Sequence, residues 1–409
     1  MSIATPSMLR QWTWTHIGYA VMGVLLTFDL IIIQEPPLIV RLALGILLVS
    51  STMIPYIRRF TIPAMPIFTW LITFYASRFI PQDYRPHHIF VNILPSLERI
   101  LYGANLSEII SKNQHPVFDV LAWLPYGVIH FSLPFFFAAV LFVFGPPKSL
   151  PVYGQAFGYM NLAGVLTQLC FPNASPWYEM SYGSAPADYS VPGEAGGLAR
   201  IDKILGLNLY GSSFGASPLV FGAFPSLHSG SATIEMCFLV YLFPRAWPIA
   251  IAYTMWMWWA TMYLTHHYLI DLVGGSIYAF SAFFVARRHL PPLRAECRTR
   301  LQYLGIQKIS VRDFIRSIEF RLNYDHIFSK PLQVVANDAT MEECEEDVFV
   351  LKEPMALRLR RFDSGSDEEE NVGLSYSGSS TPAEPSSPTT PRSPLSLPSS
   401  SQFPLQSKA

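Results

Sequence analysis

Long runs of apolar residues, separated by short polar stretches, dominate the first 290 positions of the chain. A helix that crosses a bilayer needs about 20 mostly apolar residues. By this measure the sequence predicts about eight spans, with six to eight as the range. Their approximate limits are residues 14–34, 38–56, 62–80, 117–144, 153–170, 228–243, 247–264 and 268–287.

The composition supports this interpretation. Only 14% of the residues are charged and 51% are hydrophobic, whereas about a quarter of the residues of a soluble domain are charged. The deficit of charge lies before residue 290, so we expect an all-α polytopic membrane protein followed by a soluble tail. A net charge of −1, with no zinc-finger or P-loop spacing, gives no indication of binding to nucleic acid.

The four cysteines lie far apart, two in apolar runs and two in the polar tail. This spacing predicts neither a disulfide framework nor a metal site. We therefore expect chemistry that needs no metal and no cofactor. The first apolar run is long and lacks a small-residue cleavage site, which predicts a span and not a cleaved signal peptide.

Basic residues at the ends of the spans predict the orientation, because cytosolic loops carry an excess of lysine and arginine. Arginines follow the last span, which places the C-terminus in the cytosol. With eight spans, the other basic residues on the cytosolic side are Arg10, Arg58, Arg59, Lys148 and Arg245. The segments on the luminal side are then residues 83–116, 171–227 and 265–267.

Parts of the luminal segments are predicted to be ordered. Residues 93–101 carry apolar side chains at helical spacing, with Glu98 and Arg99 on the other face, which predicts a helix lying along the membrane surface. Gly, Ser and Pro in 171–227 indicate an irregular cap, with a short helix near 198–205. Two Asn-x-Ser sequons, whose use the sequence leaves open, begin at Asn105 and Asn173.

The chain divides by composition into four regions. Residues 1–60 hold the N-terminal transmembrane helices, and residues 61–290 form a membrane domain with a luminal cap. In residues 291–362, an apolar stripe interleaved with arginines at 311–322 predicts a cytosolic amphipathic helix, on the anionic leaflet or on the protein's own loops. Residues 363–409, rich in Ser, Pro, Thr and Glu, are expected to be a disordered cytosolic tail.

Two histidine motifs stand at the luminal ends of predicted spans. In the motif at 266–271, His267 and Asp271 are one helical turn apart, so the carboxylate can hold one imidazole nitrogen. That contact fixes the tautomer and makes the other nitrogen a better nucleophile. His266 lies on a different face. We therefore predict His267 as the nucleophile and Asp271 as its orienting partner.

The other motif, at 225–229, opens a span. Ser226 is a favourable N-cap for a helix that begins near His228. The first backbone amides, up to that of Ser229, then point outward at the positive end of the helix dipole, an arrangement that binds phosphate. His228 is placed to act as a general acid or base. Ser226 and Ser229 are therefore predicted substrate-binding residues, and His228 is a predicted catalytic residue.

Each motif alone has a plain structural interpretation, because a histidine at a membrane edge is often only an interfacial polar residue. Two such motifs on one predicted side of the membrane favour a site, since ionisable groups are costly to place at membrane depth. Residues 225–228 and the pair His267-x3-Asp271 resemble the second and third signature motifs of the type 2 phosphatidic acid phosphatase superfamily. Longer strings are similar to the catalytic subunits of fungal inositol phosphorylceramide synthases, and they occupy 170–178, 196–202, 214–230 and 263–275.

The resemblance covers roughly residues 60–290 and implies a six-helix core like that of the phosphatase superfamily. It also implies an activity: the transfer of phosphoinositol from phosphatidylinositol to the primary hydroxyl of ceramide. His267 would carry the phosphoryl group between the two lipids. Residence in the Golgi membrane and a small membrane-bound regulatory subunit are further implications of the resemblance.

Two cations of the superfamily's phosphatases are missing here. No Lys-x6-Arg-Pro string is present, and Thr261 stands where those enzymes have an arginine six residues before the nucleophile. A phosphodiester carries one charge fewer than a phosphomonoester, so head-group transfer fits the missing cations better than monoester hydrolysis does. Arg200 and Lys203 in the cap are candidates for the missing charge. Candidates for contacts with inositol are Asn173, Tyr178 and Glu179.

Two alternatives stay open on the sequence. A lipid phosphate phosphatase would use the same histidines on a monoester lipid. A membrane scaffold or transporter without catalysis would need polar groups strung through the bilayer, whereas the ionisable groups here gather at one rim.

Overall fold

The computed structural model describes residues 6–55 and 57–304. The chain divides into two compact units, Met1–Pro354 and Met355–Ala409, and all described residues belong to the first. The predicted amphipathic helix at 311–322 and the predicted tail from residue 363 lie outside the described residues.

Each of the eight apolar runs contains helix, and the described chain is helical apart from turns, loops and two isolated β-bridges. The run at 117–144 is continuous through a π-helical turn, Leu124–Ile129, between α6 and α7. The helices of these runs are α1 (Pro6–Ile32), α2 (Leu38–Met53), α3 (Arg58–Ala76), α6 (Pro116–Trp123), α7 (His130–Phe144), α8 (Ser149–Cys170), α12 (Leu227–Leu242), α13 (Trp247–Tyr263) and α14 (Leu269–Ala286).

Three stretches are long and apolar enough to cross a membrane by length and composition, and two shorter helices are strongly apolar. Helices α12 and α13 have 16 and 17 residues, just short of a full span. The part of the chain that the structure describes is therefore helical throughout its regular structure, and the protein is a multi-pass membrane protein. The three long stretches are Arg58–Phe79, Pro116–Phe144 and Leu269–His289, and the two shorter ones are His16–Ile32 and Leu38–Met53.

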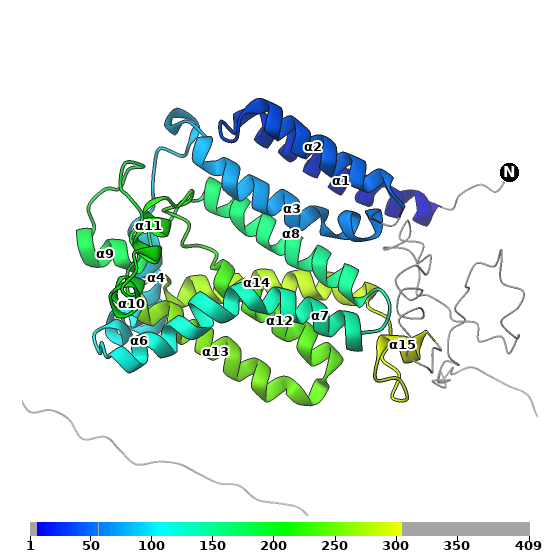
Figure 1. Ribbon diagram of the computed structural model, residues 1–409. Coiled ribbons are helices and arrows are strands. Elements are labelled where there is room, and N and C mark those ends of the chain that lie inside the picture. The colour runs from blue at the N-terminus through cyan, green and yellow to red at the C-terminus, as the bar shows by residue number, and fades with distance from the viewer. Residues whose placement is uncertain (1–5, 56, 305–409) are drawn as a thin grey trace, which may run out of the picture. The chain divides into compact units, whose positions relative to one another are not determined.

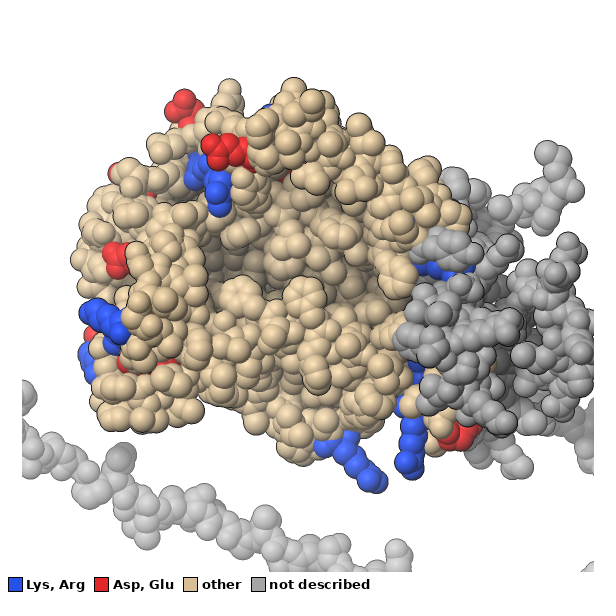
Figure 2. Space-filling model, in the orientation of Figure 1, with Lys and Arg blue, Asp and Glu red and all other residues tan. Residues whose placement is uncertain are grey.

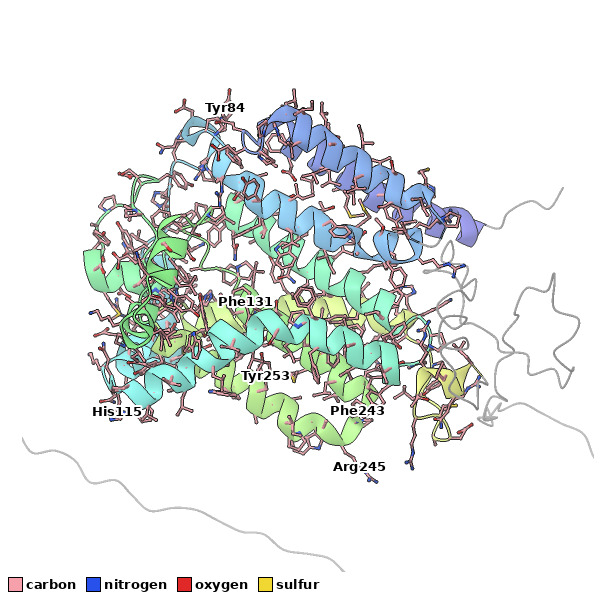
Figure 3. All side chains as sticks on the ribbon, in the orientation of Figure 1. Tyr84, His115, Phe131, Phe243, Arg245 and Tyr253 are labelled. Atoms are coloured by element: carbon pink, nitrogen blue, oxygen red, sulfur yellow. The ribbon has the colours of Figure 1, made fainter. Side chains whose placement is uncertain are left out.

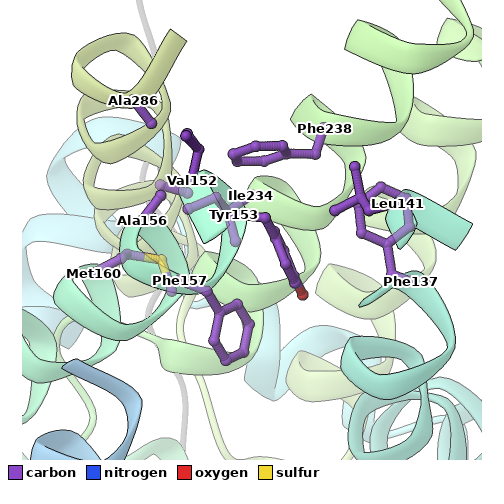
Figure 4. Packing of buried hydrophobic residues seen from close by; sticks show 11 residues of the cluster. Phe137, Leu141, Val152, Tyr153, Ala156, Phe157, Met160, Ile234, Phe238 and Ala286 are labelled. Carbon is purple, nitrogen blue, oxygen red and sulfur yellow. The ribbon is translucent and has the colours of Figure 1, made fainter. Parts of the chain in front are cut away.

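Helix α12 occupies the centre of the bundle and packs against α7, α8, α13 and α14. Aromatic and aliphatic side chains from α7, α8, α12 and α14 form the main core, in which Phe238 and Ile234 of α12 are fully buried (Figure 4). Helix α3 packs along α8, and α1 and α2 lie on the outer side of α3 (Figure 1). This packing holds α12 and α14 next to each other along their length.

The distribution of charge along the bundle fits a membrane. Figure 2 shows Lys, Arg, Asp and Glu near the two ends of one face and an uncharged, hollowed surface between them. In Figure 3, His115 lies at one end and Arg245 at the other. The prediction that charged loops flank apolar spans agrees with this arrangement.

Short helices gather at the end of the bundle where α12 and α14 begin (Figure 1). We call these helices, with their connecting loops, the cap. They include the two helices predicted at 93–101 and 198–205, which the structure confirms as α4 and α10. The cap helices are α4 (Ile93–Tyr102), α5 (Leu106–Ser111), α9 (Pro176–Tyr182), α10 (Leu198–Leu205) and α11 (Leu209–Gly215). The remaining short elements are η1 (Ser77–Phe79), η2 (Gln82–Tyr84), η4 (Pro244–Ala246), η5 (Arg287–His289) and α15 (Arg300–Tyr303).

Helix α4 differs from the prediction in one respect. Glu98, expected on the outer face of a surface helix, has no exposed area. Its two carboxylate oxygens accept hydrogen bonds from the backbone amides of Leu106 and Leu269, each at 3.0 Å. A buried carboxylate needs such donors, so α4 is anchored to the start of α14 as well as presenting apolar residues outward.

The sequons and the cysteines also have defined surroundings. Asn105 and Asn173 are 5% and 0% exposed, because their side chains form hydrogen bonds inside the cap. Cys170, Cys237 and Cys297 are free thiols, as predicted for these three residues. Cys344 lies outside the described residues.

Candidate active site

The two predicted imidazoles are in contact. Nδ1 of His228 lies 3.2 Å from Nε2 of His267, and the ring centroids are 5.3 Å apart. His228 is in the first turn of α12, and His267 lies in the loop between α13 and α14. Two motifs that are 39 residues apart in sequence therefore meet at one point, as the sequence predicted.

Asp271 completes a chain of three groups. Nδ1 of His267 lies 2.8 Å from Oδ2 of Asp271, and Asp271 is completely buried in the first turn of α14. A carboxylate can only accept here, so the hydrogen-bond network assigns the proton to Nδ1 and the lone pair to Nε2 of His267. Burial lowers the pKa of the His267 imidazole, which keeps the ring neutral and nucleophilic.

Backbone contacts lock the two helix starts together. The Ser226 amide donates to the carbonyl of Asp271 at 3.0 Å. The Ser226 hydroxyl accepts from the Ser229 amide at 3.3 Å, which is the predicted N-cap. Gly275 lies against this turn, and a Cβ there would stand 2.0 Å from the Ser226 carbonyl oxygen. Only glycine allows α14 to approach so closely.

The side chain of Ser229 points into the helix packing. Its hydroxyl donates to the Leu272 carbonyl at 2.7 Å and accepts from Nε1 of Trp258 at 2.7 Å, and it also contacts the Ser276 hydroxyl. The hydroxyl thus joins α12, α13 and α14. With the Ser229 amide held by Ser226, the amides of Leu227 and His228 are the first-turn donors left for an anion.

Two more rings surround His228, and the sequence analysis missed both. The Tyr126 ring stacks on His228 with centroids 4.3 Å apart and planes 21° apart. The His130 ring lies 4.6 Å from His228 at 42°. The sequence did contain one signal for this segment. His130 is an ionisable residue inside the apolar run 117–144, and such residues mark functional sites in membrane proteins.

Residues 94–285 match the sequence model of the PAP2 superfamily. The inositol phosphorylceramide synthase catalytic subunit of Schizosaccharomyces pombe is 48% identical over 294 residues, which cover 72% of this chain and 69% of that protein. This chain belongs to the inositol phosphorylceramide synthase catalytic subunit family.

Other relatives agree with that assignment. The inositol phosphorylceramide synthase catalytic subunit of Saccharomyces cerevisiae is 41% identical over 334 residues, which cover 81% of this chain and 82% of that protein. The phosphoinositol dihydroceramide synthase of Bacteroides thetaiotaomicron is 28% identical over 227 residues, or 53% of this chain and 73% of that protein. No solved structure matches the chain at a significant level.

His266 has a different environment in this family member. Its Nε2 lies 3.0 Å from the Ala195 carbonyl oxygen, and its ring stacks with those of Phe214 and Tyr126. Burial lowers the pKa of the His266 imidazole to about 3. The neutral ring therefore donates to the carbonyl and holds the cap against the loop that carries His267, while the Asp271 carboxylate binds the neighbouring imidazole.

Of the basic candidates of the cap, Arg200 is paired and Lys203 is exposed, although Nη2 of Arg200 is buried without a hydrogen-bond partner among the described residues. Nε of Arg200 donates to Oδ1 of Asp119 at 2.7 Å, and its guanidinium lies over the Tyr263 ring. The Tyr263 hydroxyl donates to the same Asp119 oxygen at 2.8 Å. Lys203 is exposed on α10. Neither basic side chain contacts His228 or His267.

The candidates for inositol contacts divide into two groups. Asn173 and Tyr178 are fully buried and bond to carbonyls of the cap, those of Phe171 and Ala185. Glu179 instead accepts a hydrogen bond from the Tyr268 hydroxyl at 3.1 Å, directly beside His267. The same carboxylate accepts from Asn105 and pairs with Arg99.

The family's site, as the structure describes it, holds a nucleophile and an acid or base but no cluster for a metal. Among the described residues, no group of three or more His, Cys, Asp or Glu side chains has the geometry to hold a metal ion. The imidazoles, the Asp271 carboxylate and the amides at the start of α12 are the groups available for chemistry at a phosphorus atom.

Proposed function

We propose that this protein transfers phosphoinositol from phosphatidylinositol to the primary hydroxyl of ceramide, giving inositol phosphorylceramide and diacylglycerol. The observation that carries the proposal is the chain of contacts from His228 through His267 to Asp271, with heavy-atom distances of 3.2 and 2.8 Å. A nucleophile bonded to an orienting carboxylate and adjacent to a second proton carrier is what group transfer requires.

The first half-reaction uses all three groups. Nε2 of His267 attacks the phosphorus of phosphatidylinositol as the bond to the diacylglycerol oxygen breaks. His228 gives its proton to that oxygen, and Asp271 stabilises the positive charge on the His267 ring. Diacylglycerol leaves, and phosphoinositol remains bound to Nε2.

The second half-reaction is the reverse with another alcohol. The primary hydroxyl of ceramide loses its proton to His228 and attacks the phosphorus. The bond from phosphorus to Nε2 breaks, and its electron pair returns to His267. The amides of Leu227 and His228 face the phosphate oxygens at the positive end of α12. The first half-reaction gives a proton to diacylglycerol and the second takes one from ceramide, so the two together restore the protonation state of His228.

The choice between transfer and hydrolysis has a direct test. Purified full-length protein receives phosphatidylinositol labelled in the inositol ring, with and without ceramide. We expect the label to appear on a ceramide lipid only when ceramide is present. Label that appears as water-soluble inositol phosphate regardless of ceramide would contradict the transfer. Free phosphate released from phosphatidic acid would instead support the phosphatase alternative.

We also propose that the site faces the lumen of the Golgi and that the chain crosses the membrane eight times. Eight crossings place Arg245 and the arginines after α14 on the cytosolic side. Arg245 lies at the end of the bundle opposite His115 and the cap (Figure 3), which supports this orientation. Protease protection of a tag in the cap, measured in sealed Golgi vesicles, tests it.

The organisation of the chain follows from this topology. Residues 1–60 form an N-terminal pair of helices, residues 61–290 form the catalytic domain with its cap, and residues 291–362 and 363–409 are cytosolic. Two relatives are named as catalytic subunits, and we propose that a small membrane-bound regulatory subunit joins this chain. Co-purification of a tagged full chain from its own membranes would reveal that subunit.

A further inference from the structure

His130 stands against the imidazole that moves protons. Its ring centroid is 4.6 Å from that of His228, on a segment separate from both signature motifs. Tyr126, four residues earlier, stacks on His228 from the same segment. The α6–α7 segment therefore supplies two of the rings around the site, although it contains neither motif.

The local backbone explains how two residues of this segment reach the same imidazole. A π-helical turn at Leu124–Ile129 separates α6 from α7, and single π-turns inside α-helices are frequent at functional sites. Gly127 lies within this turn, where a Cβ would stand 2.6 Å from the Trp123 ring and from the Tyr210 hydroxyl. The turn is thus packed in a way that fixes the direction of Tyr126 and His130.

His130 differs from the other rings of the site in its bonding. His266 is held by a cap carbonyl and His267 by a carboxylate. Within the described part of the chain, neither ring nitrogen of His130 has a hydrogen-bond partner, and the residue is only half-buried. A ring N–H of His130 is therefore available to a ligand beside His228.

The basic side chains of the cap that the sequence predicted for the phosphate do not contact His228 or His267. Arg200 is paired with Asp119 and Arg99 with Glu179, while Lys203 is exposed. The transition state of phosphoryl transfer places negative charge on the non-bridging oxygens, which catalysis stabilises with donors fixed in advance. A ring N–H beside His228 can serve as one such donor where a lysine or arginine is missing.

The segment also borders the uncharged surface of the bundle. Phe131, next to His130, is 63% exposed and lies at the lower edge of the hollow of this face (Figures 2 and 3). A lipid whose acyl chains lie along this apolar surface brings its phosphate to the end of α7. His130 is then between the lipid chains and His228.

We propose that His130 donates a hydrogen bond from a ring N–H to a non-bridging oxygen of the lipid phosphodiester. This inference rests on the proposed function, because it assigns a substrate contact in that reaction. It makes His130 a substrate-binding residue distinct from the nucleophile and from the proton carrier.

The test uses phosphatidylinositol in which sulfur replaces one non-bridging oxygen, as two separate diastereomers. With the ordinary lipid, we expect His130→Phe to lower kcat/KM for inositol transfer about 100-fold, the loss typical of one missing donor at a transition-state oxygen. We expect His130→Phe also to change the ratio of the rates for the two diastereomers, because only one of them places sulfur at the oxygen that His130 contacts. His130→Arg should recover part of the lost rate.

Control variants separate this role from packing. His130→Phe keeps a ring beside His228 but has no N–H, whereas His130→Gln loses the ring but keeps an N–H donor, so we expect His130→Gln to be less impaired than His130→Phe. His87→Gln changes an exposed cap histidine and should leave kcat/KM and the diastereomer ratio unchanged.

Two results would overturn the inference while leaving the proposed function standing. The first is ceramide-dependent transfer by His130→Phe with a loss below about tenfold, too small for a lost donor of this kind. The second is a diastereomer ratio in His130→Phe equal to that of the unmodified protein, whatever that value is. Failure of the unmodified protein to transfer inositol would instead contradict the proposed function itself.

Discussion

The backbone amide of Ser226 donates a hydrogen bond to the backbone carbonyl of Asp271, with a nitrogen–oxygen distance of 3.0 Å. Ser226 caps the helix that carries His228, and Asp271 orients His267. This one bond therefore ties the position of the proton carrier to that of the nucleophile. A change in the spacing of α12 and α14 should disturb both at once.

Gly275→Ala tests that dependence. The added Cβ would stand 2.0 Å from the Ser226 carbonyl oxygen, which is backbone and cannot rotate away. We expect overpacking to cost about 1–3 kcal/mol of stability and inositol transfer to fall strongly in the protein that folds. Gly45→Ala is the matched control, because no atom lies within 4 Å of its added Cβ. Thermal unfolding and transfer are measured together, and equal activity in both variants would contradict the dependence.

Asp271→Asn should lower the rate of inositol transfer more than it lowers the stability of the fold. The amide keeps the shape of the carboxylate but cannot stabilise positive charge on His267. In hydrolases with a histidine–carboxylate pair, the same change lowers kcat about 10⁴-fold, and we expect a loss approaching that here.

His267→Ala should abolish transfer and the acid-labile phosphoryl label on the protein. Transfer by His267→Ala at a near-normal rate would end the phosphohistidine mechanism.

Glu98 should make stability depend on pH. Burial raises the pKa of Glu98 to about 7, with the Asp271 charge adding to this and the Leu106 and Leu269 amides opposing it. The folded state thus holds a proton that the unfolded chain releases near pH 4.5. The contribution of Glu98 to stability is full below about pH 4.5 and is lost as the pH rises through about 7.

Glu98→Gln cannot titrate and is the variant to compare. We expect the melting temperature of the unmodified protein, relative to that of Glu98→Gln, to fall between pH 5 and pH 8, the window set by the raised pKa of Glu98 near 7. Melting curves of the two proteins in one detergent across this range make the measurement. Parallel curves would show that Glu98 does not change its protonation on folding.

The pair of Arg200 and Asp119 predicts a rescue. Arg200→Gln leaves the Asp119 carboxylate buried without its cation, and loss of one partner of a buried pair costs roughly 3 kcal/mol. Adding Asp119→Asn removes the unpaired negative charge of the Asp119 carboxylate, so the double variant should regain part of the lost stability. Because Arg200 contacts neither imidazole, we expect KM for phosphatidylinositol to change little. A large rise in KM without a loss of stability would instead assign Arg200 to the phosphate.

Local sequence pattern was enough to predict the helices and the signature motifs. Apolar runs of span length identify helices, and the four-residue spacing of His267 and Asp271 predicted their contact, although His267 itself lies in the loop before α14. The N-cap at Ser226 depends only on residues next to it in sequence. These features need no knowledge of distant contacts, and the structure has each of them.

Other parts of the site depend on contacts that no local pattern records. Tyr126 and His130 reach His228 across about 100 positions and through a π-helical turn. Glu98 caps α14 from 171 residues away, so its helical periodicity predicted the wrong environment for it. Arg200 looked available because Asp119 is 81 residues distant. In each case tertiary packing determined the role of the residue.

The burial of the two sequons bears on how the protein is studied in cells. The Asn105 amide nitrogen, to which a sugar would be attached, donates to Glu179, and Asn173 is wholly enclosed. An oligosaccharide at either position cannot coexist with the closed cap. In glycosidase-shift experiments, a sugar-bearing form of this protein should therefore identify molecules that failed to mature. Topology mapping needs acceptor sites introduced elsewhere on the cap.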